Sequence, residues 1–221
     1  MPEPTEQEVL CAVCGGHARQ FTPAAIADTS PPDFDTRPGD QKPETWIAQC
    51  PDCGYCAEDI SNAHAGAGEI VRSAEYRDRM EDPRFPALAR RFLCYALLVE
   101  KAHQWADAGW IWLQAAWVCD DAGDLMAAAQ CRERAIDRWR RGKELGQSFG
   151  DDIASEFAII TDIYRRLGQF EKATVTCAEA LDMEDVPAPV EQMLRRQMIL
   201  IQRRDTSRHS MSELQVAVRH E

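Results

Sequence analysis

The chain has 221 residues, of which 45% are hydrophobic, and it carries a formal net charge of −12 at pH 7. That length allows one large domain or two small ones, and the apolar content is enough to bury a core. The start MPEPTEQE lacks the basic and apolar parts of a secretory signal, and the longest apolar runs are too short to span a bilayer. We therefore expect a cytoplasmic protein, in which nine cysteines are more typical of metal ligands and buried thiols than of disulfides.

Acidic residues are concentrated at the front of the chain, where the first 60 residues hold eleven acidic and three basic side chains. An acidic surface repels phosphate backbones, and this argues against DNA as a ligand of this segment. The change in composition near residue 60 also divides the chain. We predict a small cysteine-rich module at 1–60, a helical domain at 61–205 and a polar tail at 206–221, whose short amphipathic stretch either docks or stays mobile.

Two short cysteine motifs lie in the front module, CAVCGG and CPDCGY, and 35 residues separate Cys14 of the first from Cys50 of the second. Four soft thiolates in two tight turns suit tetrahedral zinc, and the glycine after each second cysteine lets the backbone curl so that amide N–H groups point at the sulfurs. The separation exceeds that of an ordinary zinc-ribbon signature, so a redox dithiol and unliganded cysteines remain alternatives. The predicted zinc ligands of this zinc-ribbon-like module are Cys11, Cys14, Cys50 and Cys53.

The front module has few large apolar side chains for its length, which is near the lower limit for unaided folding. Structural zinc supplies an apparent binding free energy of about 10–16 kcal/mol, which is large beside a whole-domain stability of about 5–15 kcal/mol. Four protein thiolates leave the ion no vacant position for a reactive water. We therefore predict that the zinc is structural and that its loss unfolds the module.

Cys56 adds a further cysteine three residues after Cys53. It either replaces Cys53 as a ligand, lies unliganded beside the metal as a redox-sensitive thiol, or packs as a small apolar residue at the start of the next helix. His17 and His64 are competing ligands, but both fall outside the paired spacing, and a solvated surface histidine is the commoner outcome. We leave both histidines out of the predicted ligand set.

Helical spacing of apolar residues begins at about residue 58 and continues almost to the tail. Before it, the connector PPDFDTRPGDQKPET is rich in turn residues, and TWIAQC predicts a short strand that leads into the second cysteine motif. The chain is therefore predicted to be mainly α-helical. The predicted helices are 58–80, 87–104, 107–121, 124–147, 152–167, 170–183 and 188–204.

An internal repeat appears when WLQAAWVCDDAGDLMAAAQCRERAID is placed over FAIITDIYRRLGQFEKATVTCAEALD, at an offset of 45 residues. Gly123 then meets Gly168 at the turn, and two alanines of each unit coincide where a second helix must approach the first closely. This pattern resembles the tetratricopeptide repeat, although the period of that repeat is 34 residues. Because stacked helix pairs need about three units, we expect the flanking helices 87–104 and 188–204 to complete the stack.

The resemblance implies a partner groove. In tetratricopeptide proteins, four positions of the first helix in each unit line a concave face that grips a peptide or a protein. For the tryptophans, the spacing alone equally supports a helix packing face. The residues at the groove positions are Trp110, Leu113, Trp117 and Asp120 in the first unit, and Asp162 and Arg165 in the second.

Two arginine stripes follow helical spacing, and a solvated face explains them as well as contact with RNA, another anion or a membrane surface. The stripes are Arg134, Arg138 and Arg141, and then Arg195, Arg196, Arg203 and Arg204.

Five segments taken in order resemble an uncharacterised bacterial family in which a CPxCGY zinc knuckle precedes tetratricopeptide-like helices. The segments are CAVCGG, PPDFDTRPGD, CPDCGYCAEDIS, AAWVCDDAGD and IYRRLGQFEKA. That family has no settled activity, so the resemblance implies an architecture and no reaction.

No phosphate-binding glycine loop, GxSxG or HExxH motif occurs in the sequence. We therefore expect a non-enzymatic scaffold that grips a protein or peptide partner. The alternatives are a thiol-based redox or metal sensor that releases zinc on oxidation and, with less support, RNA binding through the arginines.

Overall fold

The computed structural model describes residues 5–22, 30–39 and 42–217. The chain forms two compact units: unit 1 comprises residues 1–27 and 42–148, and unit 2 comprises residues 28–41 and 149–221. The connector between the two cysteine motifs therefore contributes to both units, because its middle part belongs to unit 2 and its end returns to unit 1. The predicted front module, 1–60, likewise has residues in both units.

Two small antiparallel hairpins begin unit 1. Strand β1 (Thr5–Leu10) pairs with β2 (His17–Thr22), and β3 (Ala48–Gln49) pairs with β4 (Cys56–Ala57). Each hairpin carries one cysteine motif at its turn, between its two paired strands. A short 3₁₀ helix, η1 (Pro43–Thr45), precedes β3, so the strand predicted from TWIAQC is confirmed only in its second half, over Ala48–Gln49.

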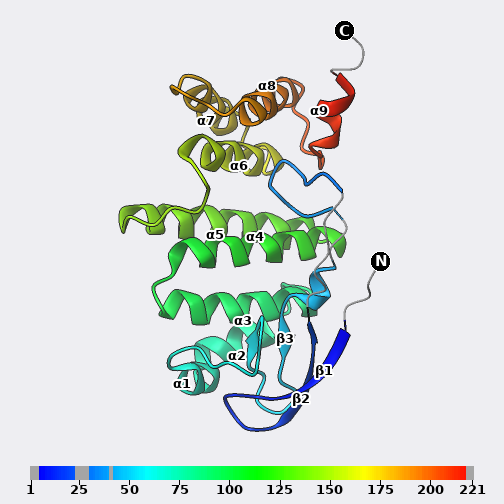
Figure 1. Cartoon of the computed structure of the whole chain (residues 1–221), viewed down its shortest axis with the longest axis vertical. Coiled ribbons are helices and arrows are strands. Elements are labelled where there is room, and N and C mark those ends of the chain that lie inside the picture. The colour runs from blue at the N-terminus through cyan, green and yellow to red at the C-terminus, as the bar shows by residue number, and fades with distance from the viewer. Residues whose placement is uncertain (1–4, 23–29, 40–41, 218–221) are drawn as a thin grey trace. The chain divides into compact units, whose positions relative to one another are not determined.

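The hairpins are followed in unit 1 by the helices α1 (Ala67–Arg72), α2 (Ala74–Glu81), α3 (Ala87–Lys101), α4 (Trp105–Asp121) and α5 (Leu125–Glu144). The three long helices, α3, α4 and α5, lie in successive layers, with α4 packed against both of the others (Figure 1). Their facing sides are apolar, and Phe92, Leu97, Leu113 and Trp139 are almost fully buried between them. Burial of this continuous apolar surface accounts for the stability of the stack.

The prediction of a single helix over 58–80 is wrong. The segment instead begins directly after β4 with turns, and it then forms the two short helices α1 and α2. Ser73 separates them because its backbone is extended and its hydroxyl accepts a hydrogen bond from the N–H of Tyr76, at 3.2 Å, which caps α2. Apolar periodicity continues across this cap, and for that reason the pattern alone did not reveal the break.

The described part of unit 2 forms the helices α6 (Ile153–Arg166), α7 (Phe170–Leu181), α8 (Ala188–Gln202) and α9 (Ser212–Ala217). The core of α6, α7 and α8 includes Phe34 from the connector, which is 0% exposed. The backbone N–H of Phe34 donates to the carbonyl of His209 at 3.1 Å, and Met211 N–H donates to the carbonyl of Pro32 at 2.8 Å. The connector therefore docks between the helices and the start of the polar tail.

The 45-residue repeat corresponds to two similar helix pairs, α4 with α5 and α6 with α7. Gly123 and Gly168 both adopt positive φ angles, 73° and 68°, at the turn within each pair. The next residue at each turn donates to the carbonyl five positions back, Asp124 to Cys119 and Gln169 to Tyr164, both at 2.9 Å. The aligned alanines, Ala128, Ala135, Ala173 and Ala180, are all buried. The predicted mainly helical fold with a small cysteine-bearing front is thus confirmed.

Among the described residues, no helix combines the length and the apolar character that a membrane crossing requires.

Candidate metal centre

Both cysteine motifs fold into the same tight turn. In the first, the N–H of Gly15 donates to the carbonyl of Cys11 at 2.8 Å, and in the second, Gly54 N–H donates to the carbonyl of Cys50 at 3.0 Å. Both glycines have positive φ angles, 74° and 78°, which residues other than glycine rarely adopt. The local sequence therefore prepares each pair of sulfurs to face one point.

The two turns bring the four predicted cysteines together, so that their Sγ atoms all lie within 4.8 Å of one another. Cys11 Sγ is 3.7 Å from Cys53 Sγ, and Cys14 Sγ is 3.6 Å from Cys50 Sγ. A tetrahedral zinc ion with Zn–S bonds of about 2.3 Å places its sulfurs about 3.8 Å apart. The donor set and its spacing therefore fit a metal ion such as zinc.

The cluster is sheltered unevenly. Cys11 and Cys50, the first cysteine of each motif, are 2% and 0% exposed, whereas Cys53 is half-buried and Cys14 is exposed. Gly16 helps the motifs to approach, because a β-carbon at this position would overlap the side chain of Asp52. One side of a bound ion would thus face the protein and the other would face solvent.

Backbone N–H groups support thiolates at the buried positions. Burial raises the pKa of Cys11, and N–H donors at Cys14 and Val13 oppose that rise. At Cys50 burial also disfavours the thiolate, but the N–H groups of Cys53 and Asp52 outweigh it and lower the pKa. Such N–H donors to sulfur are the usual outer support of a thiolate metal site.

Tyr76 of α2 anchors the second turn, and the sequence analysis missed it. Its hydroxyl donates to the carbonyl of Gly54 at 2.9 Å and accepts from the N–H of Cys56 at 2.9 Å. Tyr55 makes a similar contact, donating to the carbonyl of Asn62 at 2.8 Å. The position of Tyr76, more than twenty residues after the turn, gave no local signal of this role.

Cys56 lies at the start of β4 and is 0% exposed. Its thiol donates to the carbonyl of Gly54 at 3.3 Å, and burial raises its pKa well above the usual value. It does not belong to the four-sulfur group. His17 is exposed on β2, and His64 is half-buried with its ring 5.4 Å from that of Tyr95.

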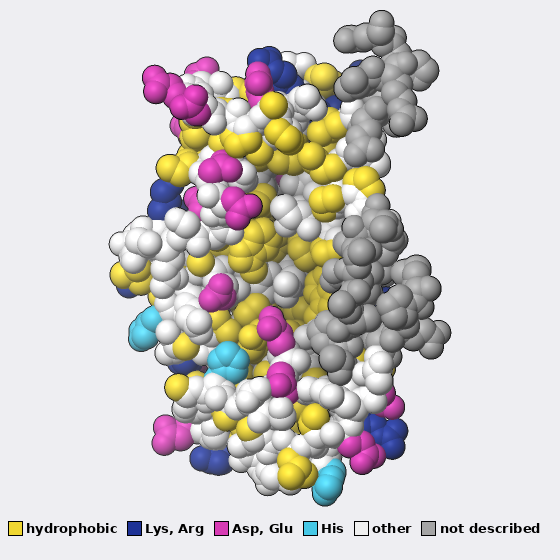
Figure 2. Space-filling view, viewed as in Figure 1, with side chains coloured by type: hydrophobic (Ala, Val, Ile, Leu, Met, Phe, Trp, Pro, Cys, Tyr) yellow, Lys and Arg dark blue, Asp and Glu magenta, His cyan; other side chains and the backbone are white. Residues whose placement is uncertain are grey.

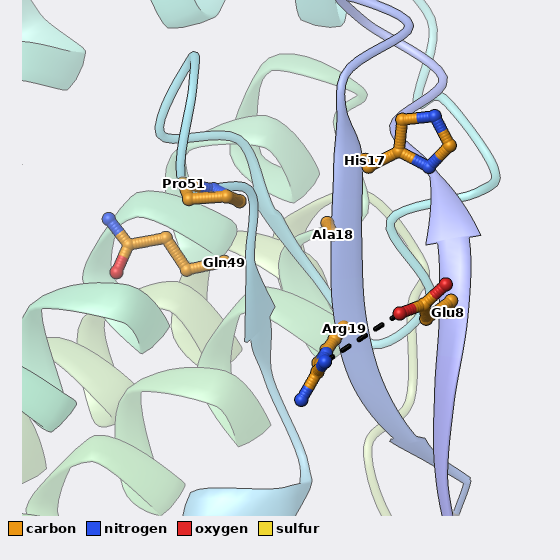
Figure 3. Close-up of a pocket in the computed structure, with 6 residues that line it drawn as sticks. All are labelled: Glu8, His17, Ala18, Arg19, Gln49 and Pro51. Carbon is orange, nitrogen blue, oxygen red and sulfur yellow. Dashed lines mark ion pairs between the residues drawn. The ribbon is translucent and has the colours of Figure 1, made fainter.

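A cavity of about 420 Å³ opens beside the hairpins, lined by residues of β1, β2 and β3 (Figure 3). Arg19 points towards Glu8 across it, at 3.6 Å, and is also 3.5 Å from Glu6. All three side chains are largely exposed, so these ion pairs contribute little to stability. Because Arg19 is shared between two carboxylates, the cavity has no clear preference for a charged ligand.

Two predicted groove residues of unit 1 are buried within α4. Leu113 is 0% exposed, and Trp117 is 3% exposed. The ring of Trp117 meets Trp46, from the end of the connector, edge-on with 6.0 Å between centroids. Trp46 also meets Phe92 of α3 edge-on at 6.4 Å. At Trp117 the chain's own Trp46 therefore lies where a partner was predicted.

The other two groove residues of unit 1 are half-buried. Trp110 packs edge-on against Trp139 of α5, with 5.2 Å between centroids. Asp120 accepts two hydrogen bonds from the guanidinium of Arg132, which joins the C-terminal end of α4 to the first half of α5.

In unit 2, the predicted groove residues Asp162 and Arg165 form a buried ion pair at 2.7 Å, with 3% and 0% side-chain exposure. Arg165 also donates to the carbonyls of Asp205 and Ser207. These contacts fix the segment that follows α8, so the pair serves the fold of unit 2. Partner binding at any of the six groove residues stays a prediction.

Most arginines of the predicted stripes have partners within the chain. Arg138, Arg141, Arg195 and Arg196 form ion pairs with glutamates, and Arg204 lies over the ring of Phe170. On the face in Figure 2, acidic and basic side chains are interspersed over the described residues. RNA binding, which requires a concentrated basic surface, stays a prediction.

Comparison with known protein families, with curated proteins and with solved structures finds no match for the chain. The resemblances to a bacterial family and to tetratricopeptide repeats therefore stay predictions, and the functional argument rests on the residues themselves.

Proposed function

We propose that the chain is a non-enzymatic, cytoplasmic protein-interaction scaffold in which a structural zinc ion fixes the two hairpins beside the helices of unit 1. The supporting observation is the sulfur cluster, whose four atoms lie within 4.8 Å of one another. Four thiolates fill the coordination sphere of zinc and leave no position at which a bound ion would activate water. Nine free cysteines also suit a reducing compartment.

The contact made by Trp46 supports the interaction part of the proposal. Helical stacks commonly bind an extended segment of a partner across several helices, with aromatic side chains as anchors. Trp46 is an aromatic residue between η1 and β3, and it packs against Trp117 and Phe92. A partner segment with an aromatic residue fits the same contact, and it would displace Trp46 to reach it.

Native mass spectrometry of the chain isolated together with its partners tests this proposal. We expect one zinc ion per chain and a protein complex of defined stoichiometry. Trp46→Ala should raise the occupancy of that complex, because it vacates the contact with Trp117. Leu145→Ala, which removes an apolar side chain that is 51% exposed on unit 1, should leave the occupancy unchanged. Two results contradict the proposal: a chain isolated without zinc, and a complex whose occupancy is the same in Trp46→Ala as in the parent chain.

Thiol-based redox sensing is the second candidate, and the sulfur distances between the two motifs favour it. Exposed Cys14 lies 3.6 Å from Cys50, and half-buried Cys53 lies 3.7 Å from Cys11. Hydrogen peroxide would take two electrons from two such thiolates, which form one S–S bond while the peroxide becomes two hydroxide ions. The zinc ion, having lost two ligands, would then leave.

Titration with hydrogen peroxide separates the two candidates. A sensor should release its zinc at peroxide concentrations that leave the helices folded, and a dithiol reductant should restore binding. Cys56→Ala should release zinc at the same concentration as the parent chain, since the Cys56 thiol is buried outside the cluster. If zinc stays bound until the helices unfold, the chain is not a sensor. The fluorescence of a zinc-binding dye follows zinc release, and circular dichroism follows the unfolding of the helices.

A further inference from the structure

The first part of the polar tail, residues 205–214, packs on unit 2 and is called the docked tail below. Its backbone contacts the connector, because Ser210 forms an isolated antiparallel bridge with Asp33. The hydrogen bonds that join the docked tail to the backbone of Phe34 and Pro32 flank this bridge. The docked tail therefore fastens the connector to unit 2.

His209 lies at the centre of the docked tail, with only 13% of its side chain exposed. Its Nδ1 is 2.9 Å from both carboxylate oxygens of Glu213 on α9, and its Nε2 is 3.1 Å from a carboxylate oxygen of Asp205. Its ring also stacks on the ring of Phe34, with 6.2 Å between centroids. One imidazole thus joins both ends of the docked tail to each other and to the connector.

The two carboxylates determine which form of the ring fits. Hydrogen bonds from Ser207, and then from His209, lower the pKa of Asp205 to about 2. Burial opposes ionisation of Glu213, but hydrogen bonds from His209 and Arg196 outweigh it and lower the pKa of Glu213. Both carboxylates are therefore ionised at neutral pH and only accept hydrogen bonds. A neutral imidazole has one N–H and can donate to one of them, whereas an imidazolium donates to both.

The hydroxyl of Ser207 does not remove this requirement. It lies 3.1 Å from Nε2 of the ring, but it donates to the other oxygen of Asp205. A neutral Nε2 would therefore direct its lone pair at a carboxylate without a proton between them. Arg165 of α6 contacts the same segment through the carbonyls of Asp205 and Ser207, and its charge is met by Asp162.

The other charged groups around the ring are paired. Arg196 of α8 pairs with Glu213 at 3.2 Å, and Arg208 of the docked tail pairs with Asp33 of the connector. Asp205 differs, because no arginine or lysine pairs with it within the part of the chain that the structure describes. The imidazolium of His209 is thus the positive charge that meets Asp205, and a neutral ring would leave this carboxylate unbalanced.

We propose that His209 is a pH-sensitive clasp, which holds the docked tail on the connector while its ring is protonated and releases it when the ring loses that proton. Because the docked state holds the proton between two carboxylates, docking is favoured at low pH and weakens as the pH rises through the range in which histidine titrates. This role is independent of the proposed interaction function.

Nuclear magnetic resonance and hydrogen exchange of the zinc-loaded chain, from about pH 6 to about pH 8.5, test the clasp. The ring nitrogens of His209 should both carry protons at the lower pH. As the ring loses its proton, the amides of residues 205–214 should lose about tenfold in protection factor, which is corrected for the effect of pH on exchange itself. The amides of residues 48–57 should keep their protection, because thiolates hold zinc as the pH rises.

Two variants assign the effect to the ring. His209→Gln should give low protection of the docked tail at both pH values, because an amide side chain carries no charge. His103→Asn is the matched control, since it removes an exposed histidine of unit 1 whose positive φ angle of 58° asparagine also adopts. It should keep the pH dependence of the parent chain.

Three results overturn the proposal. The first is a His209 ring that is already neutral at about pH 6. The second is protection of the docked tail that stays constant while the ring loses its proton. The third is a His209→Gln chain whose docked tail keeps the pH dependence of the parent chain.

Discussion

Removing zinc from the four-cysteine centre is expected to unfold both hairpins of unit 1 while α3, α4 and α5 stay folded. The hairpins are short, β3 and β4 having two residues each, and isolated hairpins of this size are at best marginally stable. Structural zinc supplies about 10–16 kcal/mol of apparent binding free energy. The long helices do not depend on the binding free energy of zinc, because they bury a continuous apolar core of their own.

Hydrogen exchange with and without a chelator measures this effect. Amides of residues 5–22 and 48–57 should lose their protection when zinc is removed, and the amides of α4 should keep it. Cys11→Ala combined with Cys50→Ala should reproduce the metal-free pattern, since it removes one buried ligand from each turn. Cys56→Ala is the matched control, because it deletes a neighbouring buried thiol outside the cluster and should leave zinc bound. Protected hairpins in the metal-free chain would show that their own packing suffices.

Local chemistry explains why the cysteine cluster was predictable. Each turn needs only six residues, two cysteines at a fixed spacing and a glycine that adopts a positive φ angle, so the sequence of CAVCGG or CPDCGY determines its own geometry. The helical repeat was predictable for a similar reason. Gly123 and Gly168 end their helices, and alanines follow where two helices touch.

Contacts between distant segments explain what the sequence did not reveal. Trp117 was predicted for a partner groove, but Trp46, about seventy residues earlier, packs against its ring. Asp162 and Arg165 were assigned to the same groove, and Arg165 donates to the carbonyls of Asp205 and Ser207, about forty residues later in the chain. Helical periodicity identifies which residues share a face, and it does not identify the segment that covers that face.

Glu100 offers the largest expected effect outside the metal centre, because its buried carboxylate joins α3 to α2, α4 and α5. It is 8% exposed and lies 2.7 Å from Arg138, 2.8 Å from Trp112 Nε1 and 2.9 Å from Arg79. Burial alone would raise its pKa, but Arg79, Trp112 and Arg138 outweigh burial and lower it. The carboxylate is therefore ionised in the folded chain, and its arginine partners depend on it for their charge balance.

Glu100→Gln should reduce the free energy of unfolding of the zinc-loaded chain at pH 7 by about 3 kcal/mol, the lower end of the range for breaking a buried ion pair. The lower end applies because both arginines are about one-fifth exposed and can recruit water. Urea unfolding measures the loss. Glu144→Gln, which removes an exposed partner of Arg141, should cost no more than about 0.5 kcal/mol.

The pH dependence of that loss separates the charge of Glu100 from its packing. A carboxyl whose pKa is lower in the folded chain contributes stability above its unfolded pKa of about 4.3, and this contribution disappears as the pH falls through the folded value. The difference between the parent chain and Glu100→Gln should therefore be largest near pH 7 and shrink below about pH 4. Acid also releases zinc from the thiolates, but it does so in both chains, so the difference between them isolates Glu100. A difference that stays constant down to pH 3 would assign the cost to lost packing and hydrogen-bond geometry instead of charge.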